Sequence, residues 1–248
     1  MMPLEKERQA WEELANLDPY WAILSDPKKK FGHWDVVEFL RTGDREITWV
    51  MESATHLGYP LQRDSALDFG CGLGRLTRAL AKYFQQCYGV DVSEGMISQA
   101  RDLHRSVPNC TFVTNAAAHL GIFSDDSFDL IYTNIVLQHL PKQMIRSYLA
   151  EFVRILRGNG LLLFQLPSFM PLWKRVQIRR RLYALLRALH VSEKLLYEGL
   201  RLCPIRMNSM PRRQVLTALD ALGAKVLQIQ ADPLADPQFQ SLFYYVTK

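Results

Sequence analysis

Three glycines at alternate positions follow an aspartate in the segment Asp68-Phe-Gly70-Cys-Gly72-Leu-Gly74. Glycines at this spacing allow a tight turn and a close approach of the backbone to a ligand. The dinucleotide pattern GxGxxG requires glycine where Arg75 stands, and no GKS or GKT of a phosphate-binding loop follows, so both of these patterns fail. Asp68 suits a ligand with a cationic part, such as an amino group or a sulfonium, better than a pyrophosphate.

A second acid, Asp91, ends the run YGVD and lies 21 residues after Gly70. A carboxylate at this place in a nucleotide-binding unit can accept hydrogen bonds from both hydroxyls of a ribose. Taken alone, Asp91 could equally cap the helix that follows it. Beside the glycine loop the ribose interpretation is favoured, and the two features together predict a site for an adenosyl group.

Short β-rich runs alternate with helical stretches in the middle of the chain. Strands are expected at 65–70, 87–92, 111–115, 128–134 and 161–166, and helices at 74–84, 93–104 and 141–156. This alternation is typical of a doubly wound α/β fold, in which a parallel sheet is covered on both faces. Ligands of such sheets bind beyond the carboxyl ends of the strands, where the strand order reverses. The loops after the first four strands should therefore line one crevice.

Four segments resemble successive motifs of class I S-adenosylmethionine-dependent methyltransferases, in the order and at the spacing of that family. They are ALDFGCGLGRLTRAL, YGVDVSEGMI, SFDLIYTNIVLQHL and ILRGNGLLLFQ. The resemblance covers residues 62–168 strongly and 210–248 by topology. It implies a Rossmann-like seven-stranded sheet, mostly parallel with an antiparallel last strand, and S-adenosylmethionine as cofactor. Residues 224–231 and 241–248 would then form strands six and seven.

The resemblance also implies roles for the matching residues. The glycine loop would border the methionine and adenosine parts, the acid before it would reach the amino group, and Asp91 would take the ribose. Val92 and Met96 would pack against the adenine, Asn115 would accept from its amino group, and Asn134 would lie near the methyl group. The full expected cofactor set is Asp68, Gly70, Cys71, Gly72, Gly74, Asp91, Val92, Met96, Asn115, Ala116 and Asn134.

His139 is the candidate general base, because an acidic or alcoholic nucleophile must lose a proton and histidine can take it near neutral pH. It stands just past the fourth strand, in Asn134-Ile-Val-Leu-Gln-His-Leu. The alternative is a histidine that packs at the helix start and hydrogen-bonds the backbone. Gln138 is a further candidate for contact with cofactor or substrate. Positioning alone can supply much of the catalysis, since a sulfonium methyl group is already activated.

Aromatic residues before the core are candidates for a lid. The segments DPYWAIL (18–24) and FGHW (31–34) precede the sheet, and in the resembled family such segments often close over the cofactor. Tyr20 and Trp21 could contact the sulfonium by cation–π attraction, and His33 could line the substrate pocket. Ordinary packing of a helical cap is the alternative.

The basic residues are concentrated in one segment. The 248-residue chain has a formal net charge of +5, yet residues 171–213 hold eleven Lys or Arg against two acids, a local charge of +9. Such a segment can attract nucleic acid, anionic lipid or an acidic substrate, or can be a solvated helical face. Its amphipathic part, 173–202, could cover the substrate or form a dimer surface, an RNA platform or a membrane-surface helix.

Composition disfavours several other classes of protein. The 48% apolar content supports a full core, no apolar run approaches the roughly 20 residues that span a bilayer, and the start of the chain lacks the pattern of a secretory leader. Four cysteines, all expected to be reduced, form no CxxC pair. No pair of residues has metal-ligand spacing, so no metal is expected. The missing leader pattern and the reduced cysteines together favour a cytoplasmic location.

We therefore expect one methyltransferase domain. It would consist of a helical cap (1–61), a cofactor-binding core (62–168), a basic helical insertion over the acceptor site (169–209) and the last helix and strands (210–248). The predicted activity is methyl transfer to an O or N nucleophile of a small-molecule acceptor. One alternative is a tRNA or other RNA methyltransferase that uses residues 171–213, and another is a non-catalytic cofactor-binding protein. The acceptor and the oligomeric state, a homo-oligomer included, stay open.

Overall fold

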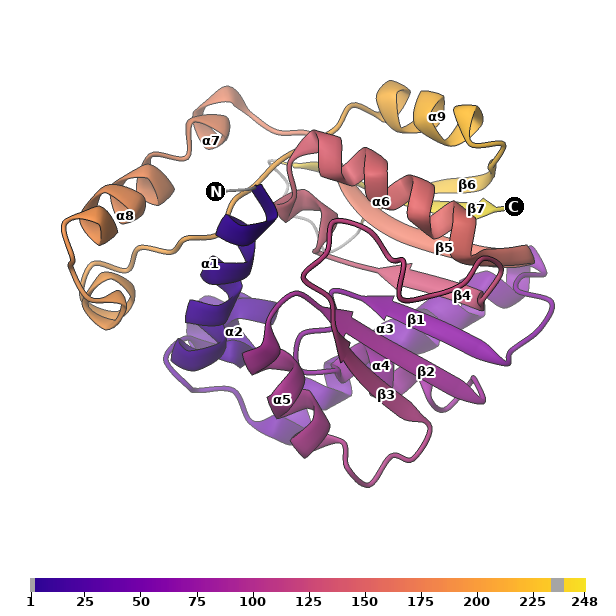
Figure 1. The fold of residues 1–248 in the computed structure, drawn as a ribbon, viewed down its shortest axis with the longest axis horizontal. Coiled ribbons are helices and arrows are strands. Elements are labelled where there is room, and N and C mark those ends of the chain that lie inside the picture. Colours follow the sequence, from indigo (N-terminus) through magenta and orange to yellow (C-terminus); the bar gives the residue numbers. More distant parts are fainter. Residues whose placement is uncertain (1–2, 233–238) are drawn as a thin grey trace.

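The computed structural model describes residues 3–232 and 239–248. Its centre is a seven-stranded sheet in the order β3-β2-β1-β4-β5-β7-β6 (Figure 1). The strands are β1 (Ser65–Phe69), β2 (Gln86–Asp91), β3 (Cys110–Thr114), β4 (Phe128–Thr133), β5 (Leu156–Phe169), β6 (Lys225–Ala231) and β7 (Gln240–Thr247). β7 runs antiparallel to β5 and β6, and the other neighbouring pairs are parallel. The expected fold class, a doubly wound Rossmann-like sheet with an antiparallel last strand, is confirmed.

The chain builds the sheet outward from β1 in two directions. β2 and β3 follow on one side of β1, and β4 then returns to its other side. The carboxyl ends of β1 and β4 therefore lie side by side where the strand order reverses, which is where sheets of this kind leave a crevice for a ligand. Every residue of β1 and β4 is buried, as expected for strands covered on both faces.

Helices cover both faces of the sheet, with α6 and α9 on one face and α3 and α4 on the other (Figure 1). The helices are α1 (Pro3–Leu17), α2 (Pro19–Ile23), α3 (Val36–Leu57), α4 (Arg75–Leu80), α5 (Glu94–Leu103), α6 (Lys142–Ile155), α7 (Leu172–Val176), α8 (Ile178–Ala188) and α9 (Arg212–Ala221). The amphipathic pattern of α6 shows why it packs there: Ile145, Leu149 and Phe152 recur at helical spacing and are buried in the core.

One strand boundary differs clearly from the sequence expectation. β5 begins at Leu156, directly after α6, because Leu156 pairs with Phe128 of β4 before the register shifts. The run RGNG (157–160), expected to separate helix and strand, therefore lies inside the strand. Leu156 and Leu161 flank it and hold it at the sheet by pairing with β4, whereas 157–160 form an irregular stretch between these pairs, in which Asn159 has a φ of 62°.

The N-terminal helices pack against the core at the edge where the crevice lies. Glu12 of α1 accepts hydrogen bonds from the Ser93 hydroxyl (2.7 Å) and the Gly95 N–H (3.0 Å) at the start of α5. A Cβ at Gly43 of α3 would lie 2.5 Å from the Arg75 carbonyl oxygen, so the absent side chain lets α3 approach α4 closely. Residues 1–2 of the expected cap lie outside the described residues.

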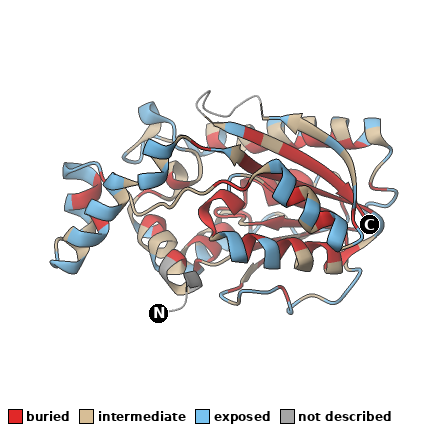
Figure 2. Ribbon diagram, turned by 90° about the horizontal axis from the view of Figure 1, so that it is seen from above, coloured by how far each residue is buried: buried red, intermediate tan, exposed pale blue. Residues whose placement is uncertain are grey.

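Residues 171–206, which we call the arm, connect β5 toward α9 and leave the body of the protein. Figure 1 shows α7 and α8 standing away from the sheet, and Figure 2 shows exposed residues along the same projection. Within the described residues, none of the helices combines the length and the apolar character needed to cross a membrane. The expected division of the chain into cap, core, insertion and final elements stays a prediction.

Candidate active site

The loop after β1 is shaped by three glycines in the left-handed region. Gly70, Gly72 and Gly74 have φ values of 77°, 51° and 75°, which residues with a Cβ rarely adopt. The N–H groups of Gly70 and Cys71 both donate to the Val90 carbonyl oxygen, at 2.7 and 3.1 Å. These two bonds fix the loop to the end of β2.

Side chains from other segments close against this loop. A Cβ at Gly70 would lie 2.3 Å from Val136, and a Cβ at Gly72 would lie 2.6 Å from Ile23 of α2. Gly74 differs, because a Cβ there would meet an aromatic ring of β3 at 2.5 Å. Gly74 therefore serves the packing of the sheet and does not border the cavity described below.

Asp91 joins the glycine loop to the start of α5. Its carboxylate accepts hydrogen bonds from the N–H groups of Gly72 (2.9 Å) and Ser93 (3.0 Å). Burial raises the pKa of Asp91, and the backbone donors act in the opposite direction by stabilising the carboxylate. A carboxylate has about four acceptor sites, so about two stay available for the hydroxyl groups of a ligand.

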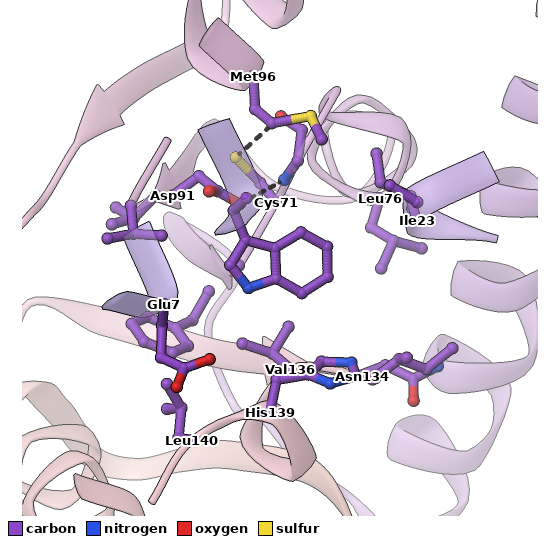
Figure 3. Close-up of a pocket in the computed structure, with 18 of the residues that line it drawn as sticks. Glu7, Ile23, Cys71, Leu76, Asp91, Met96, Asn134, Val136, His139 and Leu140 are labelled. Carbon is purple, nitrogen blue, oxygen red and sulfur yellow. Dashed lines mark hydrogen bonds between the residues drawn. The ribbon is translucent and has the colours of Figure 1, made fainter. Parts of the chain in front are cut away.

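A cavity opens beside Asp91, with an empty volume of about 960 Å³ that includes space open to solvent. The ends of β1, β2 and β4, the segment after β3, and the helices α1 and α2 enclose it. Figure 3 shows Asp91, Cys71 and Met96 on one side and His139 and Asn134 on the other. The expected site residues in its lining are Gly70, Cys71, Gly72, Asp91, Val92, Met96, Asn115, Asn134 and His139.

Three expected cofactor residues lie outside this lining: Asp68, Gly74 and Ala116. The Asp68 carboxylate is buried and accepts a hydrogen bond from the Thr77 hydroxyl of α4 (2.7 Å). Burial raises the pKa of Asp68 to about 7. This side chain therefore ties β1 to α4 and does not face the cavity.

Asn115 lines the cavity while its side chain also holds its own loop together. Nδ2 donates to the His119 carbonyl oxygen (2.8 Å), and Oδ1 accepts from the Ala117 N–H (3.2 Å). An amide oxygen has two lone pairs, so Oδ1 retains one acceptor site. Asn115 thus keeps a hydrogen-bond acceptor beside the cavity, as its expected contact with the adenine amino group requires.

The N-terminal segment reaches the cavity through residues that the sequence did not single out. Trp11 of α1 and Ile23 of α2 belong to the lining. Tyr20 packs instead on Phe39 of the cap, Trp21 packs on Tyr197 of the inserted segment, and His33 is exposed. Successive residues of a helix point in different directions, so an aromatic composition does not by itself identify which side chains face a ligand.

A buried network centred on Glu46 of α3 forms one end of the cavity. Its carboxylate accepts hydrogen bonds from the Tyr132 hydroxyl (2.8 Å) and Asn134 Nδ2 (2.7 Å) and pairs with Arg75 (2.8 Å). Among the described residues, the buried atoms Asn134 Oδ1 and Arg75 Nε have no hydrogen-bond partner. A free acceptor and a free cationic donor fit the ammonium and carboxylate groups of a methionine.

Sequence reasoning missed Glu46, Arg75, Trp11 and Ile23. Arg75 directly follows the glycine loop, where the dinucleotide pattern has a glycine. This mismatch was the one sequence signal that could have pointed to Arg75 as a site residue. The other three precede the core and belong to no motif, so only their packing reveals them. Within the described residues, no group of three or more His, Cys, Asp or Glu side chains could hold a metal ion.

A second cavity, with an empty volume of about 1600 Å³ that includes open solvent, adjoins the first. The two share Arg75, Asn134 and Ile135, and most of the exposed wall of the second is apolar surface. Ile135 has a φ of 61°, a conformation that is rare for a β-branched residue and costs about 1–3 kcal/mol. Its N–H donates to Gln165 Oε1 (3.2 Å). A strained residue thus stands where the two cavities meet.

His139 lines the first cavity, and its neighbour Gln138 lines the second. Nδ1 of His139 lies 2.6 Å from the Arg206 carbonyl oxygen, which can only accept, so Nδ1 carries the proton. Nε2 then accepts from the Gln138 amide at 3.3 Å. Burial lowers the pKa of His139 to about 4, so the imidazole is neutral at physiological pH.

This site is a cofactor site of the nucleotide-binding α/β type, as defined by the glycine loop, the acid after β2 and the strand order. Comparison with known proteins shows which family has it. Residues 67–164 match the family model described as a methyltransferase domain. An uncharacterized methyltransferase from Bacillus subtilis (strain 168) is 33% identical over 96 residues, which cover 38% of this chain and 37% of the relative. Trans-aconitate 2-methyltransferase from Deinococcus radiodurans is 36% identical over 104 residues, covering 41% of this chain and 37% of the relative. The chain thus spans little more than a third of the length of either relative.

Solved structures share the fold over a longer stretch. Magnesium protoporphyrin IX methyltransferase from Synechocystis PCC 6803, crystallised with bound SAH, has a TM-score of 0.65 at 17% identity, and the match covers 100% of both chains. The core of this chain is a class I S-adenosylmethionine-dependent methyltransferase domain, as the resemblance of its motifs predicted. S-adenosylmethionine is the cofactor of this class, which confirms the expected cofactor.

The burial of His139 predicts a specific pH dependence of stability. Its pKa falls from 6.5 to about 4 on folding, so between these values the unfolded chain binds a proton that the native protein does not. Stability is therefore lost as the pH falls through this window, by up to about 1.4 kcal/mol per pH unit. Urea unfolding across this range should show that the wild type loses on the order of 3 kcal/mol more than His139→Asn.

The asparagine in His139→Asn can still donate to the Arg206 carbonyl oxygen, and the buried carboxyls Asp68 and Asp91 titrate in both proteins. The difference between the two proteins therefore isolates the imidazole. Equal losses of unfolding free energy in both would contradict the assignment of a buried, neutral His139.

Proposed function

We propose that this protein transfers a methyl group from S-adenosylmethionine to an O or N nucleophile of a small-molecule acceptor by in-line displacement. The observation that carries the proposal is the junction of two cavities at Asn134 and Ile135. The first cavity has the chemistry of a cofactor site, and the second opens from its methionine end. A group held at the junction is accessible from both sides.

Each part of the cofactor has a matching group in the first cavity. S-adenosylmethionine would supply a methyl group already activated on a sulfonium. Asp91 would accept from the ribose hydroxyls, and Met96 would pack against the adenine. Asn134 Oδ1 would accept from the ammonium group, and Arg75 would donate to the carboxylate. Trp11 would cover the cofactor and exclude water from the sulfonium.

The walls of the second cavity support an acceptor with an apolar part. Trp49, Met207 and Phe243 contribute apolar surface, and Arg45 and Gln138 contribute polar groups. A molecule held between these residues would present its nucleophile to the junction, where orientation and proximity supply the main part of the rate enhancement. The name of one relative, trans-aconitate 2-methyltransferase, specifies a small-molecule acceptor.

We further propose that His139 assists as a neutral hydrogen-bond acceptor and as an anchor of the turn after β4. A group with a pKa of about 4 is poorly matched to abstracting a proton near pH 7, so general-base help from His139 is small. The turn itself is held by the returning end of the arm and the residues after it. The Arg206 carbonyl accepts from His139 Nδ1 (2.6 Å), and Asn208 N–H donates to the Gln138 carbonyl (2.6 Å).

The direct test is transfer of label from tritiated S-adenosylmethionine to a panel of apolar carboxylic acids, phenols and amines, with total tRNA as a separate sample. We expect label in at least one small molecule, and we expect Asp91→Asn to lower the labelling at least about tenfold at sub-saturating cofactor. Calorimetry should show that Asp91→Asn binds S-adenosylhomocysteine at least about tenfold more weakly, because a ribose hydrogen bond to a charged acceptor is lost.

Asp102→Asn, an exposed site on α5, is the matched control and should bind like the wild type. Label in tRNA alone would overturn the small-molecule proposal in favour of RNA methylation. Tight cofactor binding with no transfer to any member would favour a non-catalytic binding protein.

The proposed role of His139 predicts a small kinetic effect. With the acceptor that the panel identifies, His139→Asn should lower kcat by less than about tenfold, because its amide preserves the bond to Arg206. Loss of a true general base typically costs about 10²–10⁴-fold. A loss in that range, with an unchanged affinity for S-adenosylhomocysteine, would restore His139 as the base and refute the anchoring role.

A further inference from the structure

The outer side of α8 carries a row of exposed apolar side chains. Ile178, Leu182 and Leu185, followed by Leu189 just past the helix end, are 69%, 43%, 59% and 65% exposed. Their spacing of four, three and four residues places them on one face of the helix. Leu172 and Trp173 of α7, at the root of the arm, are exposed too, at 75% and 64%.

The opposite side of α8 already has its partners within the protein. Tyr183 is buried and donates to Glu13 of α1, and Arg187 pairs with the same carboxylate (3.2 Å). Arg180 donates to the Pro204 carbonyl oxygen (3.1 Å). The inner face therefore fixes the arm to the body, so the outer apolar row contributes little to holding it there.

This apolar row is not typical of the surface as a whole. Of the sixteen large apolar residues that are exposed in the described part of the chain, ten lie between Phe169 and Leu200. Contiguous exposed apolar surface of this kind usually marks an interaction site, because its hydration is unfavourable.

The charge around the row is strongly positive. Residues 171–206 hold nine Lys or Arg against two acids, Glu193 and Glu198, and Glu193 is already paired with Arg187. Arg175 and Arg181 are exposed and have no acidic partner among the described residues. Arg181 lies three residues after Ile178 and four before Leu185, directly beside the apolar row.

We propose that the arm docks on an anionic lipid surface, with Ile178, Leu182, Leu185 and Leu189 entering the interface and Arg175 and Arg181 pairing with lipid headgroups. An apolar helix face flanked by cations, with a nearby tryptophan, has the chemistry of an interfacial helix. The lipid headgroups supply the negative charge, and the apolar row inserts at the boundary between the headgroups and the acyl chains.

Other partners match this surface less well. In a two-fold dimer formed through this face, the same positively charged patch would lie on both sides of the interface, and the two patches would repel each other. RNA would engage the arginines through phosphates but would leave the four aliphatic side chains in water.

Docking would also place the second cavity near the lipid. Lys174 of α7 lies over the ring of Phe239, 4.0 Å from its centroid, and Phe239 lines that cavity. The root of the arm and the cavity wall are thus in contact. This docking does not depend on the identity of the acceptor or on the proposed activity.

The test is co-sedimentation of the full chain with vesicles made of equal parts phosphatidylcholine and phosphatidylglycerol, or of phosphatidylcholine alone. We expect binding to the anionic vesicles that weakens in high salt, and much weaker binding to the neutral ones. The double variant Leu182→Ser/Leu185→Ser should lower the partition coefficient at least about tenfold. Arg175→Gln/Arg181→Gln should lower it roughly tenfold at low salt and reduce the salt dependence.

A matched control replaces two exposed apolar residues elsewhere, Val37→Ser/Leu61→Ser, which are 62% and 68% exposed in the wild type. It should bind vesicles like the wild type, and all three variants should bind S-adenosylhomocysteine like the wild type, which shows that they are folded. Failure of the wild type to sediment with anionic vesicles would overturn the proposal. The proposal would also be overturned if the leucine variant bound vesicles as well as the wild type. It would likewise be overturned if the wild type formed a dimer or a tRNA complex that these variants lose, and did not bind vesicles.

Discussion

One buried carboxylate holds the cofactor end of the site together. Asp91 accepts from Gly72 and Ser93 and so joins the loop after β1 to the helix after β2. This geometry requires β1 and β2 to be parallel neighbours, with Phe69 opposite Val90. It also requires a left-handed backbone at Gly72, which turns the N–H toward the acid. Two backbone donors offset part of the cost of burying the charge and leave acceptor sites directed at the cavity.

A second long-range contact organises the other end of the site. Glu46 comes from α3, far outside the nucleotide-binding motifs, and its carboxylate gathers Tyr132, Asn134 and Arg75 around one point. The close approach of α3 to α4 at Gly43 brings it there. Because Glu46 occupies Nδ2 of Asn134, the amide oxygen is left as a free acceptor beside the junction of the cavities.

The fold and the cofactor side of the site were predictable because their signals are local. Buried strands, a glycine turn and an acid at the end of β2 are short patterns, and parallel strand order brings their ends together without further information. The contributions of Trp11, Ile23 and Glu46 were not predictable, because they depend on how separate helices dock. The aromatic residues Tyr20 and Trp21 were reasonable lid candidates by composition, but they pack on Phe39 and Tyr197, and the same helix presents Ile23 to the cavity.

We infer that the first cavity holds S-adenosylmethionine with its reactive end at the junction of the two cavities. A crystal structure of the full chain with S-adenosylmethionine tests it most directly. We predict ribose hydroxyls on the Asp91 carboxylate, the ammonium group on Asn134 Oδ1, and the methyl carbon facing the second cavity past Ile135. A ribose remote from Asp91, or a methyl group turned toward α1 with no access to the second cavity, would contradict it.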